Sequence, residues 1–556
     1  MRLWNSNAKS KRWRVMPLLL WFALLLVAAG HWSCSPARLE LDLYYPHGDG
    51  STVFQRISRF SISVKGESLK SGDGAEFDPS EDKQNILPNI ECNPTSEGET
   101  PRLEIEVLGL TGQGAVFASG RSVLFHKCGE KKNIPVLLSP KGQFSTLTAF
   151  FRPQQGLPFT EAAQMNEVRA GHQVVTLSDG RLLITGGANV RGLGKIQSVS
   201  GETDIFDPTT GIFTKGPSMS SNRAFHTATV IGDSVVVVGG LDVINDQIVP
   251  VRNIDIFTLN AAGKLVRQDG PALVEGRAFH TATRLGSTNN ILVFGGMTWV
   301  NGTQQMAAKW EIHNPGESAV LASGDVDAAN RRAMHASAVL TDTGRILLAG
   351  GLQVNSSGNI DTLNTALTAF TIEQAGQLRA VLETISGSMK SKRAGHTATV
   401  LENGDVLLVG GMEARADNIF VPQTVVKTME VIKKDGTFAT GDAFNLDQAR
   451  VFHSTIRLTD GRVLVYGGIN RIGDQGANKD VAFTADRAEI FNSDPDNGIR
   501  PTPLKVLQRK DRFMQSATRL LNGSVVIIGG VAPPAGAPDY VTLSRGEMFN
   551  PGPTSQ

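Results

Sequence analysis

The chain is poor in the residues on which many enzymes and redox proteins depend. Its 556 residues include three cysteines, four tyrosines and six tryptophans, and charged residues make up only 19% of it, against about a quarter in an average globular protein. The sequence contains no G-x-S-x-G, H-E-x-x-H or phosphate-binding loop, which excludes the common hydrolase, zinc-protease and nucleotide motifs. It also lacks a polar low-complexity tract long enough to predict a disordered protein.

An excess of positive charge is also missing. Five basic residues lie within residues 2–14, ahead of Glu40, the first acidic residue, and without them the chain has 49 basic and 53 acidic residues. A mildly acidic body with no basic stripe is a poor partner for nucleic acid, so we set that class of function aside.

Glycine and apolar residues are abundant instead. Glycine contributes 59 residues and hydrophobic residues make up 40% of the chain, whereas glycine is about 7% of an average protein. The composition predicts a turn-rich rather than helix-rich protein that can bury a sizeable core.

Residues 1–34 have the pattern of an export signal. An apolar run of 15 residues, Met16 to Gly30, follows the five basic residues; it suits a signal sequence and is short for a membrane span. Ser33-Cys34 resembles the end of a bacterial lipobox, although His31 stands where that motif has an aliphatic residue. Lipidation of Cys34 is the outcome we favour; cleavage after Gly30 would release a soluble protein, and no cleavage would leave a single anchor. All three predict a body outside the cytoplasm, and the favoured lipid anchor would place it at a bacterial cell envelope.

The first folded domain is predicted over residues 35–150. Short alternating β-prone runs, separated by Gly, Pro, Asn and Ser clusters, predict an antiparallel β-sandwich of immunoglobulin-like type. Cys92 and Cys128 lie in this domain, and if Cys34 is lipidated they form an even pair in an oxidising compartment. We therefore expect a disulfide between them; two buried free thiols are the alternative.

Residues 151–556 contain an internal repeat. Seven aliphatic runs each end in a glycine pair, whose second members are Gly187, Gly240, Gly296, Gly351, Gly411, Gly468 and Gly530. An Arg-x-x-His element lies upstream of each pair, with Gln in the last copy: Arg169 and His172, Arg223 and His226, Arg277 and His280, Arg332 and His335, Arg393 and His396, Arg450 and His453, and Arg512 with Gln515. Tight turns such as SDGR lie between the two, and a third element such as TDIFDP follows most of the pairs. Each unit is therefore a small antiparallel sheet that needs neighbours to bury its faces, which predicts a β-propeller.

These elements resemble the kelch repeat family, with its aliphatic run ending in Gly-Gly and its Arg-x-x-His start. The resemblance covers residues 155 to 551 and implies an all-β fold: a seven-bladed kelch-type β-propeller preceded by the small sandwich. Galactose-oxidase-like copper enzymes have a similar propeller, but their site needs a tyrosine cross-linked to a cysteine. This propeller has no cysteine and only Tyr466 and Tyr540, so we expect no cofactor and no metal.

The seventh unit lacks an outermost strand of its own. Residues 159–169, FTEAAQMNEVR, match residues 213–223, FTKGPSMSSNR, with Met165 against Met219. We expect residues 159–169 to supply the missing strand, which would close the ring without an open sheet edge.

The repeated arginines and histidines each admit two interpretations. The arginines either hold an anion at the channel mouth or, as we favour, bridge to carbonyls of the adjacent blade. The histidines either surround a metal ion or, as we favour, do the same packing and hydrogen-bonding job in every blade.

A ligand site is predicted on the face that carries the long connections after the glycine pairs, because loops that vary on a fixed scaffold carry specificity. The alternative is that these loops only shield the channel and the first domain binds. Large side chains on the loops give the candidate contact residues Trp299, Arg415, Arg471 and Tyr540.

The function we expect is that of an exported binding or interaction module, with an unidentified envelope protein or glycan as its partner. The alternative is a carbohydrate-active enzyme of mutarotase or lyase type that works in the propeller channel. Candidate loops for that chemistry contain Asp242, Glu413 and Asp480.

Overall fold

The computed structural model of this chain describes residues 39–44, 56–66, 75–77, 102–125, 132–149, 161–191, 195–300, 302–355, 359–363, 366–374, 378–415, 418–439, 444–475, 478–485, 487–494, 498–500, 506–507, 512–532 and 540–552. This part of the chain is all-β, with one short 3-10 turn, η1 (Ala328–Asn330), as its helical element. Within it no helix is long and apolar enough to cross a membrane. Cys34, Cys92 and Cys128 lie outside the described residues, so the lipidation and the disulfide stay predictions.

The first domain has two sheets around a small core. One sheet has the order β3-β2-β4-β5-β7 and the other pairs β1 with β6 in parallel, which departs from the antiparallel arrangement expected. The core includes Phe60, Ile105 and Ile134, which lie on strands of both sheets. The strands are β1 (Leu39–Tyr44), β2 (Arg59–Gly66), β3 (Ala75–Phe77), β4 (Arg102–Leu110), β5 (Val116–Phe125), β6 (Lys132–Leu137) and β7 (Ser139–Pro140).

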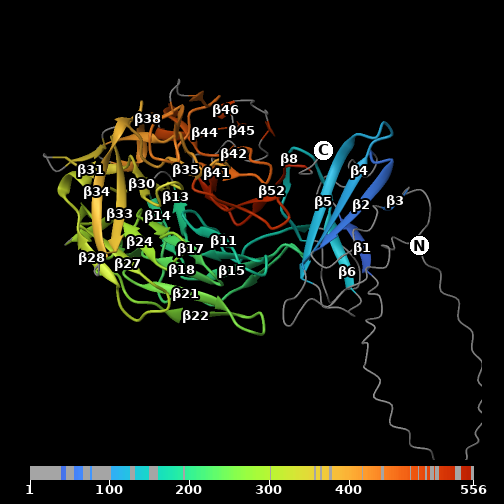
Figure 1. Cartoon of the computed structure of the whole chain (residues 1–556), viewed down its shortest axis with the longest axis horizontal. Helices are drawn as coiled ribbons and strands as arrows, with labels where there is room; N and C mark the ends of the chain where they lie inside the picture. Colours follow the sequence, from blue (N-terminus) through green and yellow to red (C-terminus); the bar gives the residue numbers. More distant parts are fainter. Residues whose placement is uncertain are drawn as a thin grey trace, which may run out of the picture.

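Seven antiparallel sheets of one plan follow, which we number as units in chain order (Figure 1). The first unit has β11 (Gln173–Thr176), β12 (Leu182–Thr185), β15 (Thr203–Asp207) and β16 (Ile212–Lys215). The second has β17 (Thr227–Ile231), β18 (Ser234–Val238), β21 (Ile254–Leu259) and β22 (Leu265–Asp269). The third has β23 (Thr281–Arg284), β24 (Ile291–Phe294), β27 (Lys309–His313) and β28 (Ala322–Asp325). The fourth has β29 (Ala336–Val339), β30 (Ile346–Ala349), β33 (Ala366–Gln374) and β34 (Leu378–Ser388).

The last three units keep the same strand order. The fifth has β35 (Thr397–Val400), β36 (Val406–Val409), β39 (Thr428–Ile432) and β40 (Phe444–Asn445). The sixth has β41 (Ser454–Arg457), β42 (Val463–Tyr466), β45 (Arg487–Asp494) and β46 (Gly498–Arg500), with β47 (Val506–Leu507) also paired to β45. The seventh has β48 (Ser516–Arg519), β49 (Val525–Ile528), β52 (Gly546–Asn550) and, as its outermost strand, β8 (Gln143–Thr146).

The strand that completes the seventh unit corrects one sequence-based expectation. The strand does come from the N-terminal side, but it is β8 and not residues 159–169. Within 159–169, β10 (Glu161–Ala162) pairs instead with β9 (Thr148–Ala149). Phe144 of β8 is buried against Tyr466 and Phe549, with ring centroids 5.0 and 4.9 Å apart. The strand β8, which follows the first domain in the chain, therefore occupies the edge that residues 159–169 were expected to fill.

The first strands of neighbouring units lie side by side all round, and β48 contacts both β41 and β11. The second glycine of each pair sits at this junction with a positive φ of 90 to 111°. Its amide donates a hydrogen bond of 2.8 to 2.9 Å to the carbonyl of the repeat arginine in the next unit. The first of these bonds runs from Gly187 to Arg223, and the last runs from Gly530 to Arg169. These backbone bonds join the seven sheets into one closed circle, because the last of them returns to the first unit.

The connections after the glycine pairs form seven two-stranded hairpins rather than irregular loops. They are β13 (Ala188–Arg191) with β14 (Lys195–Val199), β19 (Leu241–Ile244) with β20 (Gln247–Pro250), β25 (Met297–Val300) with β26 (Thr303–Met306), β31 (Leu352–Val354) with β32 (Ile360–Thr362), β37 (Met412–Arg415) with β38 (Asn418–Val425), β43 (Ile469–Gln475) with β44 (Asn478–Thr484), and β50 (Val531–Ala532) with β51 (Val541–Thr542). We call the side that carries them the hairpin face. The opposite side, where the first strand of each unit turns into the second, is the turn face.

The first domain lies beside the seventh unit (Figure 1) and is bonded to it. Asn550 is buried, and its amide nitrogen donates to the carbonyls of Ser119 and Ser139 at 3.0 and 2.8 Å. Asn522, in the turn between β48 and β49, donates in the same way to the carbonyl of Arg121 at 3.0 Å. Two asparagines of the seventh unit thus donate hydrogen bonds to carbonyls of β5 and β7, the last two strands of the first domain's larger sheet.

Candidate functional site

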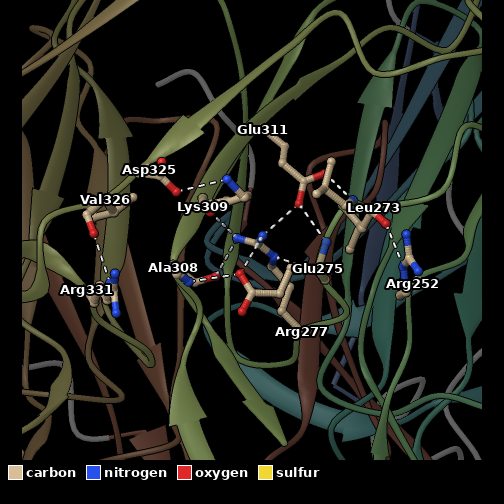
Figure 2. A network of polar contacts seen from close by, with 12 residues as sticks. Arg252, Leu273, Glu275, Arg277, Ala308, Lys309, Glu311, Asp325, Val326 and Arg331 are labelled. Carbon is tan, nitrogen blue, oxygen red and sulfur yellow. Dashed lines mark hydrogen bonds and ion pairs between the residues drawn. The ribbon is translucent and has the colours of Figure 1, made fainter. Parts of the chain in front are cut away.

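The seven repeat arginines are buried, and each donates hydrogen bonds to backbone carbonyls of its own unit. Arg277 shows the arrangement (Figure 2): its guanidinium donates to the carbonyls of Gly295 and Lys309 and, at 2.7 Å, to the Glu311 carboxylate. The favoured interpretation named carbonyls of the adjacent blade, and the structure corrects it, because both carbonyls belong to the same unit. Not every donor is engaged in the other units: the buried Nε atoms of Arg169, Arg223, Arg393 and Arg512 have no hydrogen-bond partner among the described residues.

The carboxylate partners are the residues that sequence reasoning missed. Each is an acid in the third strand of its unit. Glu311 also accepts the backbone amides of Val274 and Glu275, and so connects its strand to the segment that precedes Arg277. A signal was present, since an acid precedes the Phe or aliphatic residue of motifs such as TDIFDP and AEIFN. The acids are Asp204, Asp255, Glu311, Glu430, Glu489 and Glu547.

The fourth unit departs from this plan. Arg332 is equally buried, but Thr368 stands at the position of the acid and its hydroxyl accepts at 3.0 Å. The backbone carbonyls of Asn330 and Leu348 accept two further hydrogen bonds from the Arg332 guanidinium. Burial lowers the pKa of Arg332 to about 10, and among the described residues of the fourth unit no carboxylate pairs with this buried cation.

The repeat histidines are buried and neutral. Burial, with a smaller contribution from the nearby repeat arginine, lowers the pKa of His172, His280 and His453 to about 3. His280 Nε2 lies 3.1 Å from the Thr227 hydroxyl of the preceding unit. The ring also covers the first glycine of that unit: a Cβ on Gly239 would lie 2.8 Å from His280 Cε1. This geometry supports the packing interpretation, and the described residues contain no group of three metal-binding side chains.

The axis of the ring is closed at the hairpin face. The residue before each repeat His or Gln has a positive φ of 51 to 62°, and its amide donates to the equivalent carbonyl of the unit before it, so seven bonds form a second closed circle. These residues are Gly171, Phe225, Phe279, Met334, Gly395, Phe452 and Met514. The left-handed conformation costs about 1–2 kcal/mol for a residue with a side chain, and five of these seven residues have a bulky side chain.

An aromatic plug covers this circle. Phe420, which is buried in β38 of the fifth hairpin, lies 5.6 and 5.7 Å from the rings of Phe225 and Phe279. The inner sides of the hairpins join the same apolar cluster through residues such as Met306 and Tyr540. A ligand on the hairpin face would therefore contact the hairpins and could not enter the channel from that side.

The candidate contact residues fall into different environments. Tyr540 is buried and Trp299 is half-buried against the apolar cluster, whereas Arg471 is exposed. Arg415 ends β37, and its side chain lies outside the described part. Asp242 and Glu413 are half-buried on the second and fifth hairpins, and the side chain of Asp480 is not among those described.

The hairpins carry exposed aliphatic residues that were not singled out from the sequence. Six of the eleven large hydrophobic residues found exposed in the described part lie on the hairpins. Ile244, Ile248, Val249 and Val300 belong to the neighbouring second and third hairpins, and β20 contacts β25; we call these four the aliphatic patch. Ile244 is 51% exposed and Val300 47%, so each leaves about half of its apolar surface in water, an arrangement typical of interaction surfaces.

Comparison with known proteins gives one partial likeness. No family model matches the chain. The chain is 25% identical over 242 residues to tRNA wybutosine-synthesizing protein 4 of Candida albicans, a match that covers 42% of this chain and 33% of that protein. The chain thus matches about a third of the length of that relative.

Proposed function

We propose that this protein is a binding module: an exported, seven-bladed kelch-type β-propeller behind an immunoglobulin-like domain, which holds a partner at the bacterial envelope by its hairpin face. The observation that carries the proposal is the aliphatic patch. Its side chains stay exposed, although Met297 and Met306 of the third hairpin are buried in the cluster over the axis and Leu241 of the second hairpin is buried as well. Burial of exposed aliphatic surface is the main favourable term in most protein associations.

A protein partner accounts for the patch better than a glycan does. Glycan sites present planar aromatic rings and polar groups, whereas this patch is isoleucine and valine. The enzyme alternative has less support, because it requires free carboxylates or histidines in the channel. The six third-strand carboxylates bind arginine, and the histidines are buried and neutral.

The test compares the full chain with a variant in which three patch residues are made polar: Ile244→Ser, Ile248→Ser and Val300→Ser. Binding to a solubilised envelope fraction is measured by biolayer interferometry. We expect the variant to lose at least tenfold in affinity, because a few buried apolar anchors carry most of an interface's free energy.

The matched control changes three equally exposed residues that lie off the hairpins, Val230→Ser, Val266→Ser and Leu321→Ser. It should bind as the unchanged protein does. Equal binding by the patch variant would show that the partner contacts another surface, such as the first domain.

Attachment to the membrane is a separate part of the proposal. If Cys34 carries the lipid, Cys34→Ala removes the acylation site and should move the protein from the membrane fraction to the soluble fraction. A membrane-bound Cys34→Ala variant would contradict lipidation.

A further inference from the structure

The hairpins around the aliphatic patch contain acidic residues and no basic ones. The second, third and fourth hairpins, residues 241–250, 297–306 and 352–362, contain Asp242, Asp246 and Asp361 and no Lys, Arg or His. The first hairpin is the reverse, because its charged residues are Arg191 and Lys195, both exposed. Since β14 of the first hairpin contacts β19 of the second, the hairpin face changes from positive to negative between these two neighbours.

Asp242 shares one side of the second hairpin with two residues of the aliphatic patch. In the register of this hairpin Asp242 pairs with Val249, and Ile244 pairs with Gln247. Alternate residues of a strand point to the same side of it, so Asp242 and Ile244 lie on one side together with Val249. Directly paired side chains of an antiparallel ladder have their Cβ atoms about 4.5–5.5 Å apart. The Asp242 carboxylate is therefore an immediate neighbour of exposed aliphatic surface.

Asp242 has no cation as a partner within the described part of the chain. Its Oδ1 accepts the amide of Val243 at 2.7 Å. Burial raises the pKa of the Asp242 carboxyl, and that hydrogen bond is the contribution that opposes the rise. The next basic residue along the chain, Arg252, donates its Nε to the carbonyl of Leu273 at 2.8 Å. Asp246, which is exposed in the hairpin turn with a φ of 61°, also belongs to no ion pair of the described residues.

A partner that covers the aliphatic patch also covers this carboxylate. Contact with Ile244 and Val249 removes water from Asp242, because the three side chains lie on one side of the hairpin. Desolvation of an unpaired carboxylate costs more free energy than is gained by burying the exposed parts of two aliphatic side chains. The partner therefore needs a positive charge at this place. Lys and Arg suit it, because their aliphatic stems pack on apolar surface while the charged end reaches the carboxylate.

We propose that the aliphatic patch binds a protein segment that has aliphatic side chains next to Lys or Arg, and that these positive charges pair with Asp242 and Asp246. The inference rests on the proposed function and adds the chemistry of the partner to it. The apolar contacts hold the complex together, whereas the two carboxylates attract a basic surface and repel an acidic one. Charges of this kind act mainly on the rate of association and on the choice of partner.

The test measures association of the full chain with the solubilised envelope fraction by biolayer interferometry at low and high salt. The double variant Asp242→Asn, Asp246→Asn should associate at least about fivefold more slowly than the unchanged chain at about 20 mM salt, and within about twofold of it at about 500 mM, because salt screens the charges. Asparagine keeps the oxygen that accepts the Val243 amide and tolerates the positive φ of Asp246, so the fold is retained.

The matched control is the double variant Asp233→Asn, Glu402→Gln. It removes the same amount of charge from two exposed acids in turns on the turn face. Its rate of association should equal that of the unchanged chain at both salt concentrations. An equal slowing of the control and of the hairpin variant would mean that the net charge of the protein, and not the two carboxylates beside the patch, sets the rate, and would overturn the inference.

The outcomes distinguish this inference from the proposed function. If the patch variant loses binding while the variant of Asp242 and Asp246 associates like the unchanged chain at low salt, the patch binds a partner of another chemistry and only this inference is wrong. If the unchanged chain does not bind the fraction, or if neither variant alters binding, the proposed function is wrong as well. Trypsin cleaves after Lys and Arg, so digestion of the fraction should abolish binding; binding that survives digestion would show that the partner is not such a protein segment.

Discussion

The amide of Gly530 donates a 2.8 Å hydrogen bond to the carbonyl of Arg169, and this contact joins the end of the repeat region to its beginning. Gly529, the first glycine of the same pair, lies against the same residue: a Cβ placed on it would come within 2.5 Å of the Arg169 carbonyl and 2.6 Å of His172 Cε1. The closure of the circle therefore depends on two residues without side chains, packed where the seventh unit meets the first.

Gly529→Ala should lower the free energy of unfolding by about 2–4 kcal/mol, because the added methyl group clashes with backbone and the φ of +63° strains any residue with a side chain. Urea unfolding of the full chain measures the change. Gly232→Ala is the control: it has a φ of +57° but nothing within 4 Å of its Cβ, and about 1–2 kcal/mol of backbone strain is all that we expect. Equal effects of the two substitutions would mean that the junction is not closely packed.

The repeat arginines should differ in how well they tolerate replacement. Arg277→Met leaves Glu311 buried without its cation and should cost about 3–5 kcal/mol of stability. Arg332→Met leaves no charge behind, because its unit has Thr368 in place of the acid, and should cost at least 2 kcal/mol less. Thermal and denaturant unfolding of both variants gives the comparison. A larger loss for Arg332→Met would mean that the fourth unit contains a counter-charge of another kind.

The outermost strand of the seventh unit gives a test of how the ring is completed. Phe144→Ala should destabilise the protein by about 3–5 kcal/mol, because a buried aromatic side chain is lost between Tyr466 and Phe549. Phe213→Ala, at the partly buried outermost strand of the first unit, should cost less. Unfolding followed by intrinsic fluorescence measures both. A change below 1 kcal/mol for Phe144→Ala would contradict the role of β8.

Much of the architecture could be predicted from the repeat, because each unit contains the same three sequence elements. The glycine pairs, the turns and the start of each first strand coincide with the expected positions. Other features depend on the fold as a whole and have no local signature. Residues 159–169 match an outer strand in sequence, yet β8 takes that place because it follows the first domain directly.

The site depended still more on tertiary structure. Phe225 and Phe279 stand in an unremarkable position between Arg and His, and only the assembled ring shows that they adopt a positive φ and surround the axis. Candidate residues chosen for size, such as Tyr540, turned out to pack in the apolar cluster.

The buried histidines make stability depend on pH. The pKa of His280 is about 3 in the folded protein and about 6.5 in the unfolded chain, so between these values the unfolded state binds the extra proton. Stability is therefore complete above about pH 6.5 and falls as the pH drops toward 3, by up to about 1.4 kcal/mol per pH unit for each such histidine.

His280→Gln should remove the contribution of one histidine to this pH dependence, because glutamine does not bind a proton in this range. Glutamine should fit the position, because Gln515 occupies the equivalent place in the seventh unit. The loss of stability between pH 7 and pH 5 should shrink by about 2 kcal/mol, the free energy of protonating one unfolded histidine over that range. Gln515→His is the reciprocal variant and should enlarge the loss by a similar amount, because a histidine placed there would also be buried and neutral. Urea unfolding at the two pH values measures both changes. If neither variant alters the pH dependence, the histidines titrate alike in the folded and unfolded states and do not have the buried, neutral role assigned to them.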